Sequence, residues 1–206
     1  MKRKNLIIFL LIVFITLSFT HPPYSLVKFV YDGDTILIDT GEKVRYLGID
    51  APEIGREGKK SEYMAFESRD LNLRLIHQCR VKLEFDQGKR DSHGRLLAYV
   101  YVENGDMINA LLVRRGLAYV MIKRPNLKYV KLLLEYQRLA MTEKLGIWRK
   151  EPVKQEKCYM GNRKSYRFHR PTCPFAAKIL SHNLVRLKTR HDAFWEGFGP
   201  CKQYRP

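Results

Sequence analysis

The sequence predicts an α+β fold: a barrel of five short strands with three helices, followed by a small C-terminal α/β module. Short apolar segments separated by turn residues predict the strands, and longer stretches with apolar residues at helical spacing predict the helices. A change in charge near residue 150 predicts the second module. With 45% hydrophobic and 12% aromatic residues, the 206-residue chain can form a packed core, which excludes a wholly disordered protein.

Five segments have the composition of short strands. They are Leu26–Tyr31, Thr35–Thr40, Lys43–Ile49, Arg80–Phe85 and Leu96–Val102. Tight turns at residues 32–34 and 41–42, each containing a glycine, connect the first three strands into an antiparallel meander. Alternation along the third strand predicts that Arg45, Leu47 and Ile49 share one face, with Asp50 at the end of the strand.

Three segments have helical character, namely Glu57–Ile76, Asp106–Gly116 and Lys128–Leu145. Asp106 is expected to cap the second helix, and Gly146 ends the third. Five short strands interrupted by one helix and followed by two more predict a barrel of the OB type.

The first 20 residues predict a signal peptide or an N-terminal anchor. A basic start at residues 2–4 precedes an apolar run over residues 6–19, which is too short for an ordinary membrane-spanning helix. We therefore expect an exported protein. It is either secreted after cleavage or tethered to the membrane by the uncleaved segment.

The net charge of +17 indicates a polyanionic partner, either nucleic acid or an anionic membrane surface. Residues 25–148 contain 21 Lys/Arg and 17 Asp/Glu, a net of +4, whereas residues 149–206 contain 14 and 4, a net of +10. This contrast divides the chain into a domain at 25–148, a linker at 149–157 and a small basic module at 158–206.

Carboxylates and arginines cluster at the ends of the predicted strands. Asp34 and Asp50, with the backbone carbonyl of Ala51, supply the oxygen ligands that Ca²⁺ prefers. Arg45 and a second arginine, Arg95, can grip a phosphate. Glu53 can orient or deprotonate a water molecule. The alternative is that these groups form turns and that Arg45 pairs with a neighbouring carboxylate for structural reasons alone.

Several runs together resemble the thermonuclease (staphylococcal nuclease-like) family over residues 26–148. They are Asp32–Thr35, Val44–Glu53, Asp91–Tyr99, Asn109–Ala118 and Leu145–Trp148. The resemblance implies an OB barrel with three helices. It also implies Ca²⁺-dependent hydrolysis of phosphodiester bonds in DNA, with RNA as a second candidate substrate, leaving 3′-phosphate and 5′-hydroxyl ends. Asp34, Asp50 and Ala51 match its metal ligands, Arg45 and Arg95 its phosphate-binding arginines, and Glu53 its general base or water-orienting group.

His93 stands where the family often has a tyrosine near the nucleotide, and Tyr119 is expected to stack against a base. The other function considered is a catalytically inactive nucleic-acid-binding protein on the same fold. The intact set of five charged matches argues against it. We expect a monomer.

The C-terminal module predicts either a zinc site or a disulfide. His169, Cys173 and Cys201 occur in segments that resemble the small metal-binding domain of Ada-type DNA-repair proteins. Tyr204 stands at the position of the fourth ligand, which departs from the pattern of that domain, so Cys158 is the other candidate for this ligand unless the site is lost. The alternative is a disulfide between Cys173 and Cys201 that staples a module too small to form a core of its own.

Overall fold

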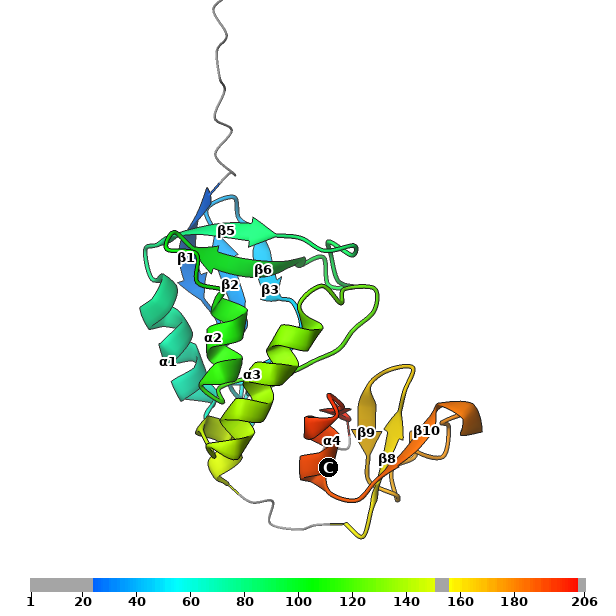
Figure 1. The fold of residues 1–206 in the computed structure, drawn as a ribbon. Coiled ribbons are helices and arrows are strands. Elements are labelled where there is room, and N and C mark those ends of the chain that lie inside the picture. Colours follow the sequence, from blue (N-terminus) through cyan, green and yellow to red (C-terminus); the bar gives the residue numbers. More distant parts are fainter. Residues whose placement is uncertain (1–23, 151–155, 204–206) are drawn as a thin grey trace, which may run out of the picture.

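The computed structural model describes residues 24–150 and 156–203, so the predicted leader and the middle of the predicted linker lie outside the described residues. Five strands form a closed barrel in the order β1-β2-β3-β6-β5, as predicted. They are β1 (Tyr24–Val30), β2 (Thr35–Ile38), β3 (Lys43–Tyr46), β5 (Arg80–Glu84) and β6 (Leu96–Val102). The β3–β6 pairing is parallel and the other pairings are antiparallel. Figure 1 shows the barrel with three helices below it.

The third predicted strand is broken, which corrects the sequence analysis. β3 ends at Tyr46, and the chain turns at Gly48, whose φ is +76°. β4 (Ile49–Asp50) then pairs with β7 (Tyr119–Val120) in a separate two-stranded sheet. A side chain on Gly48 would collide with Leu133, so both the backbone conformation and the close packing require glycine there. The turn redirects Asp50 away from the axis of β3.

Three helices pack against one end of the barrel. They are α1 (Ala65–Ile76), α2 (Ile108–Arg114) and α3 (Val130–Thr142), and a 3₁₀ turn, η1 (Gly146–Arg149), follows them. The first helix begins eight residues later than predicted, because residues 51–64 form a loop. Asp106 does not cap α2, which has Met107 as its N-cap and no side-chain cap.

A buried asparagine connects α2 to the break between β3 and β4. The Asn109 side chain is fully buried, accepts a hydrogen bond from the Val100 N–H (2.9 Å) and donates one to the Leu47 carbonyl (2.9 Å). These bonds satisfy backbone groups that the broken strand leaves unpaired. They hold the turn that leads to Asp50 against the barrel.

The C-terminal module is a four-stranded sheet with one helix. Its sheet order is β10-β8-β9-β11, with β9 and β11 parallel. The elements are β8 (Tyr159–Asn162), β9 (Arg167–His169), the 3₁₀ turn η2 (Ser181–Asn183), β10 (Leu184–Leu187), α4 (Arg190–Trp195) and β11 (Gly199–Pro200). A capping box between Thr189 and Asp192 starts α4. Across the described parts of the chain, no helix is both long and apolar enough to cross a membrane.

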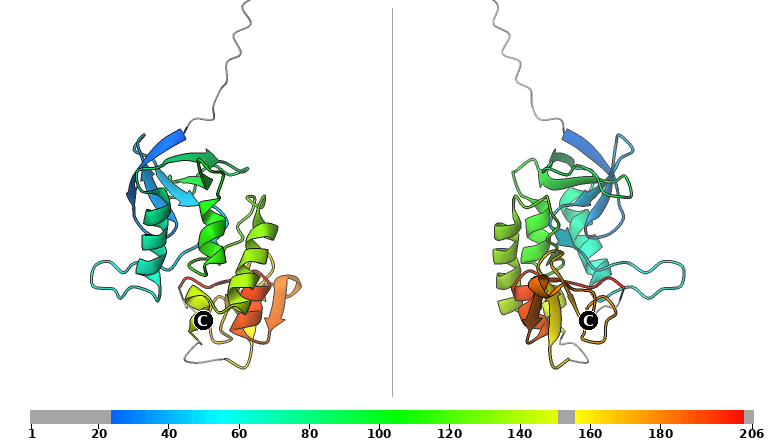
Figure 2. Two further views of the ribbon diagram at one scale, coloured as in Figure 1. Left: turned by 60° about the vertical axis from the view of Figure 1, so that its left-hand side comes forward. Right: turned by 90° about the vertical axis from the view of Figure 1, so that its right-hand side faces the viewer.

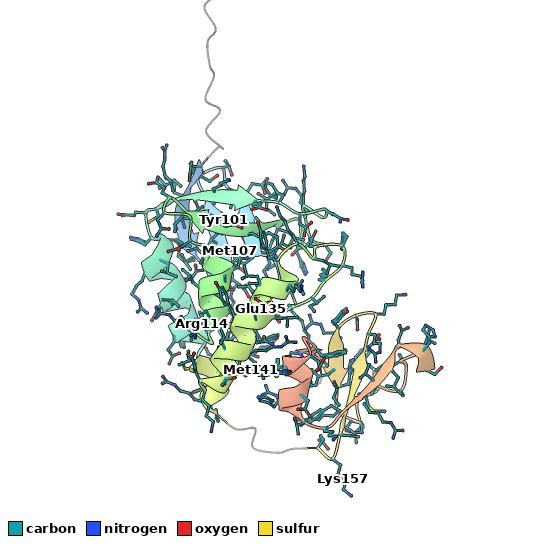
Figure 3. The ribbon with its side chains drawn as sticks, in the orientation of Figure 1. Tyr101, Met107, Arg114, Glu135, Met141 and Lys157 are labelled. Atoms are coloured by element: carbon teal, nitrogen blue, oxygen red, sulfur yellow. The ribbon has the colours of Figure 1, made fainter. Side chains whose placement is uncertain are left out.

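The module packs against the barrel domain through a shared apolar cluster. Tyr119 and Met141 from the barrel domain lie in one buried cluster with module residues that include Phe168 and Phe194. All views place α4 beside the C-terminal half of α3, where Met141 is labelled (Figures 1, 2 and 3). The fully buried Gln137 on α3 accepts from the Val120 N–H and donates to the Phe194 carbonyl, both at 2.6 Å.

Candidate functional site

Asp34 lies on the turn between β1 and β2, in contact with the chain just after β4. Its carboxylate accepts hydrogen bonds from the Ala51 N–H (2.6 Å) and the Thr35 hydroxyl (3.0 Å). The turn can approach this closely because residue 33 is glycine. A Cβ there would lie 1.9 Å from the Ser68 hydroxyl and 2.7 Å from the Ala51 methyl. Gly33 therefore fixes the distance between the two acidic loops.

Arg45 joins the two aspartates. It lies on β3 directly opposite Thr35 of β2, and only 6% of it is exposed. Its guanidinium forms ion pairs with both Asp34 and Asp50. A buried guanidinium is costly without such partners, so this group and the two carboxylates depend on one another. Two carboxylates and one guanidinium leave the cluster with one excess negative charge.

Asp50 has three charged or polar partners, two of which come from distant parts of the chain. Besides Arg45, the Tyr119 hydroxyl donates to it (2.6 Å), and the Lys202 Nζ lies 3.6 Å from its Oδ1. Burial raises the pKa of Asp50, but the charges of Arg45 and Lys202 and the Tyr119 hydrogen bond outweigh it, and the pKa is lowered. Asp50 is therefore held ionised.

Glu53 and Arg95 line one open cleft of about 720 Å³ beside the buried cluster. Glu53 is exposed, on a loop closed by hydrogen bonds between its backbone and Glu62 (3.0 Å each). The Arg95 guanidinium is held by Asp91, with the Nε–Oδ2 distance at 2.8 Å. The same cleft is lined by Asp32 and by Lys202. The structure thus brings the six residues predicted to bind metal or act in catalysis, Asp34, Arg45, Asp50, Ala51, Glu53 and Arg95, to one edge of the barrel.

Two predicted substrate contacts have different positions. His93 is exposed in the loop before β6 and lines a second cleft with Arg45 and Arg95. Tyr119 does not present its ring for stacking, because the ring is buried edge-on against Phe194 at a centroid distance of 5.4 Å. Its hydroxyl instead supports Asp50.

The sequence analysis missed two charged residues near this site. Burial raises the pKa of Asp32, although Arg45 and a hydrogen bond with Thr35 act against it. Asp32 lies in the same turn as Asp34, so its place in that acidic turn was a usable signal. Lys202 lies 152 positions from Asp50, and nothing in the local sequence pattern connects the two residues.

The donor set of the acidic cluster fits a hard divalent cation. Asp34 and Asp50 offer carboxylate oxygens, and the Ala51 carbonyl belongs to the same short segment. Carboxylate and carbonyl oxygens are the ligands that Ca²⁺ prefers. The residues present therefore fit the cation that the sequence predicts.

A second cluster lies in the C-terminal module. The ligand atoms of His169, Cys173 and Cys201 lie within 4.8 Å of one another, and all three residues are buried. Both thiols are free, so the structure lacks the disulfide that was the alternative. Burial and the charge of Arg167 lower the pKa of His169, which favours the neutral imidazole that binds metals. Tyr204, the predicted fourth position, lies outside the described residues.

The closed barrel with an acidic, arginine-containing edge places the protein in the OB-fold class with a site suited to phosphodiester chemistry. A family model described as staphylococcal nuclease homologue matches residues 43–150. The chain belongs to this family of phosphodiester-hydrolysing nucleases, as the sequence predicts.

Individual relatives support the assignment. The chain is 36% identical to a thermonuclease of Staphylococcus intermedius over 126 residues, which covers 60% of this chain and 74% of the relative. It is 40% identical to the endonuclease YncB of Bacillus subtilis, covering 58% of each chain. Identity to the B. subtilis prophage-derived endonuclease YokF is 36%, over 63% of this chain. The match spans only 45% of the length of YokF.

Proposed function

We propose that the protein is a calcium-dependent nuclease that cleaves DNA, and also RNA, to 3′-phosphate and 5′-hydroxyl ends. One observation carries the proposal: Arg45 joins Asp34 and Asp50 at the edge of a cleft that Glu53 and Arg95 line. A purely structural ion pair would not need a cleft that presents a further carboxylate and a further guanidinium. Family membership and relatives named as nucleases add support.

Asp34, Asp50 and the Ala51 carbonyl would hold calcium, which supplies positive charge for the phosphate when bound. Arg45 and Arg95 would bind the non-bridging phosphate oxygens through paired hydrogen bonds and stabilise the charge that accumulates there. Glu53 would orient a water molecule and accept its proton as the oxygen attacks phosphorus. The bond from phosphorus to the 5′ oxygen then breaks, the leaving oxygen takes a proton from solvent water to give the 5′-hydroxyl, and the phosphate stays on the 3′ side.

Digestion of plasmid DNA with Ca²⁺, compared with excess chelator, tests this function. We expect cleavage only with calcium, and products whose 5′ ends can be phosphorylated without prior phosphatase treatment. Asp34→Ala should weaken calcium binding measured by calorimetry, with Asp39→Ala, an exposed aspartate, as the control. A folded protein that binds DNA but cuts it at no calcium concentration would instead support the inactive alternative.

We also propose that His169, Cys173 and Cys201 bind zinc. Two thiolates and an imidazole are favoured zinc ligands, and a structural site requires a fourth. Metal analysis of the purified protein should give about one zinc per chain, reduced in Cys173→Ser and unchanged in Cys79→Ser, whose thiol is exposed. Absence of zinc from the wild-type protein after expression in zinc-supplemented medium would refute this.

We also propose that the protein is exported and monomeric. The apolar run and basic start of the leader support export, but both lie outside the described residues. Sequencing the N-terminus of the mature protein distinguishes a cleaved leader from a membrane anchor.

A further inference from the structure

A cleft of about 500 Å³ lies between the barrel domain and the C-terminal module, and its lining is strongly cationic. Seven cationic side chains line the cleft, four from the barrel and three from the module, and the one acidic residue in the lining is Asp91. They are Arg45, Arg95, Lys123 and Arg124 from the barrel, and Lys164, Arg167 and Lys202 from the module. Arg45, Arg95 and Lys202 belong both to this lining and to the immediate surroundings of the acidic cluster. The cationic cleft is thus continuous with the candidate catalytic site.

The module wall of this cleft is fixed in place by buried contacts. Arg167 on β9 donates to the Pro200 carbonyl (3.1 Å) and reaches the Met121 sulfur (2.8 Å) across the domain boundary. The Cys201 N–H donates to the Phe168 carbonyl (2.9 Å), which holds the segment after β11 against β9. Lys202 follows directly on this segment, so the position of its backbone is set by the module sheet.

Lys202 reaches the nuclease site from the module. Its Nζ lies 3.6 Å from Asp50 Oδ1, yet its side chain is 52% exposed. It therefore faces the cleft with free N–H donors while it stands next to a candidate metal ligand. An ammonium group in this position can contact a phosphate that neighbours the one being cleaved.

The charge of the module gives a reason for this arrangement. Three of the seven cations, Arg45, Arg95 and Lys202, already face carboxylates. Within the described residues, no ion pair joins the other four cations of the lining, Lys123, Arg124, Lys164 and Arg167, to a carboxylate, and their mutual repulsion is relieved when an anion enters the cleft. A polynucleotide strand is such an anion, with phosphates at regular intervals that release counterions when they are bound.

We propose that the C-terminal module forms the second wall of the substrate cleft, and that Lys164, Arg167 and Lys202 bind phosphates of the polynucleotide strand beside the cleaved one. This inference rests on the proposed nuclease function. It makes the enzyme one that prefers long strands to dinucleotides, because only a long strand reaches the module wall.

The test compares Lys164→Gln/Lys202→Gln with Arg186→Gln/Lys188→Gln in the full-length protein. Both double variants remove two positive charges from exposed positions of the same module. Arg186 and Lys188 lie on or next to β10, at the opposite edge of the module sheet from β11. Melting curves confirm that all three proteins are folded.

Binding of a labelled single-stranded DNA is measured by fluorescence anisotropy with excess chelator, so that the strand is bound without being cleaved. We expect Lys164→Gln/Lys202→Gln to bind about tenfold more weakly, with the slope of log K against log salt reduced by about 1.4, or about 0.7 for each lost phosphate contact. The control variant should bind with nearly the slope of the wild type. Equal slopes for the two double variants would overturn the inference.

Cleavage with calcium provides the second measurement. The ratio of kcat/KM for a long strand to that for a dinucleotide should fall about tenfold in Lys164→Gln/Lys202→Gln. An unchanged ratio in an active enzyme overturns the inference and leaves the nuclease function standing. Strand binding that shows the predicted loss of slope, without cleavage by the wild type, does the reverse: the nuclease function fails and the cleft wall remains.

Discussion

The barrel domain and the C-terminal module bury their apolar side chains in different ways. In the barrel domain, five strands close on themselves, and α1–α3 complete a core drawn from that domain almost alone. In the module, four short strands form an open sheet, and its core includes Tyr119 and Met141 from the barrel domain. A unit of about 45 residues has too little interior to be stable by itself without such help. The module is therefore an attachment that depends on the barrel.

The two regions also use charge differently. The barrel domain has 21 basic and 17 acidic residues, and two of its carboxylates, Asp34 and Asp50, face the buried Arg45. The module is strongly basic, and part of that charge lines the cleft shared with the barrel. Our two proposals assign the bond-breaking groups to the barrel and a share of substrate binding to the module. The following substitutions test this division, starting with the largest expected effect.

Glu53→Gln should lower turnover by about 10²–10⁴-fold, because the amide cannot accept the proton of the attacking water. Glu53 is exposed, so the melting temperature should not change. Glu67→Gln on the exposed face of α1 is the matched control and should keep wild-type turnover. Wild-type turnover in Glu53→Gln would show that Glu53 is not the general base, and the division of roles between barrel and module would be wrong.

Phe194→Ala should destabilise the module by about 3–5 kcal/mol. The ring is 2% exposed and contacts Tyr119, Trp148 and Phe168 at centroid distances of 5.0–5.4 Å. Hydrogen exchange should show faster exchange of the amides of β8 and β9 while those of the barrel strands remain protected. Phe66→Ala, at an exposed position on α1, should change little. Equal loss of protection in both regions would show one cooperative unit instead of a barrel with an attachment.

Gln137→Leu should cost about 1–3 kcal/mol, because it leaves the Val120 N–H and the Phe194 carbonyl without their buried partner. Urea unfolding followed by tryptophan fluorescence gives the value. Gln87→Leu, on an exposed loop of the barrel, serves as the control. A change in unfolding free energy no larger than that of the control would mean that the Gln137 hydrogen bonds add nothing to the stability given by the apolar cluster between the two regions.

Thr189→Ala should cost about 1 kcal/mol, because it removes the hydroxyl oxygen that accepts a hydrogen bond from the Asp192 N–H (2.9 Å) at the start of α4. Thr172→Ala, exposed in the same module, should have no measurable effect. The loss should appear in thermal melting of the module and leave calcium-dependent cleavage of a dinucleotide unchanged. A lower rate on the dinucleotide would show that α4 acts on the chemistry.

The sequence predicted the barrel well because its signals are local. Alternation and turn residues located all five strands, and the carboxylates and arginines chosen from the sequence lie together at one edge of the barrel. The break at Gly48 was missed, since a positive φ leaves no mark on the apolar pattern. The first helix was placed too early, because residues 57–62 contain no apolar residue that would mark where the helical spacing begins. In the structure, backbone and side-chain contacts between Glu53 and Glu62 hold this stretch as a loop.

The contacts between the two regions could not be predicted in the same way. Tyr119 was expected at a base, but its neighbours Asp50 and Phe194 are 69 and 75 positions away. The pairing of β4 with β7 places Asp50 beside Tyr119, and the docked module places Phe194 there. Lys202 was one basic residue among the 14 of the basic C-terminal segment. Its contact with Asp50 depends on a tertiary interface that no local periodicity encodes.

Tyr119 belongs to both regions at once, with its ring in the core of the module and its hydroxyl on Asp50. Any loosening of the module on heating must therefore move a phenol that helps to hold an active-site carboxylate. Heat inactivation of the enzyme should then follow the melting of its smaller part, at temperatures where the barrel is still intact.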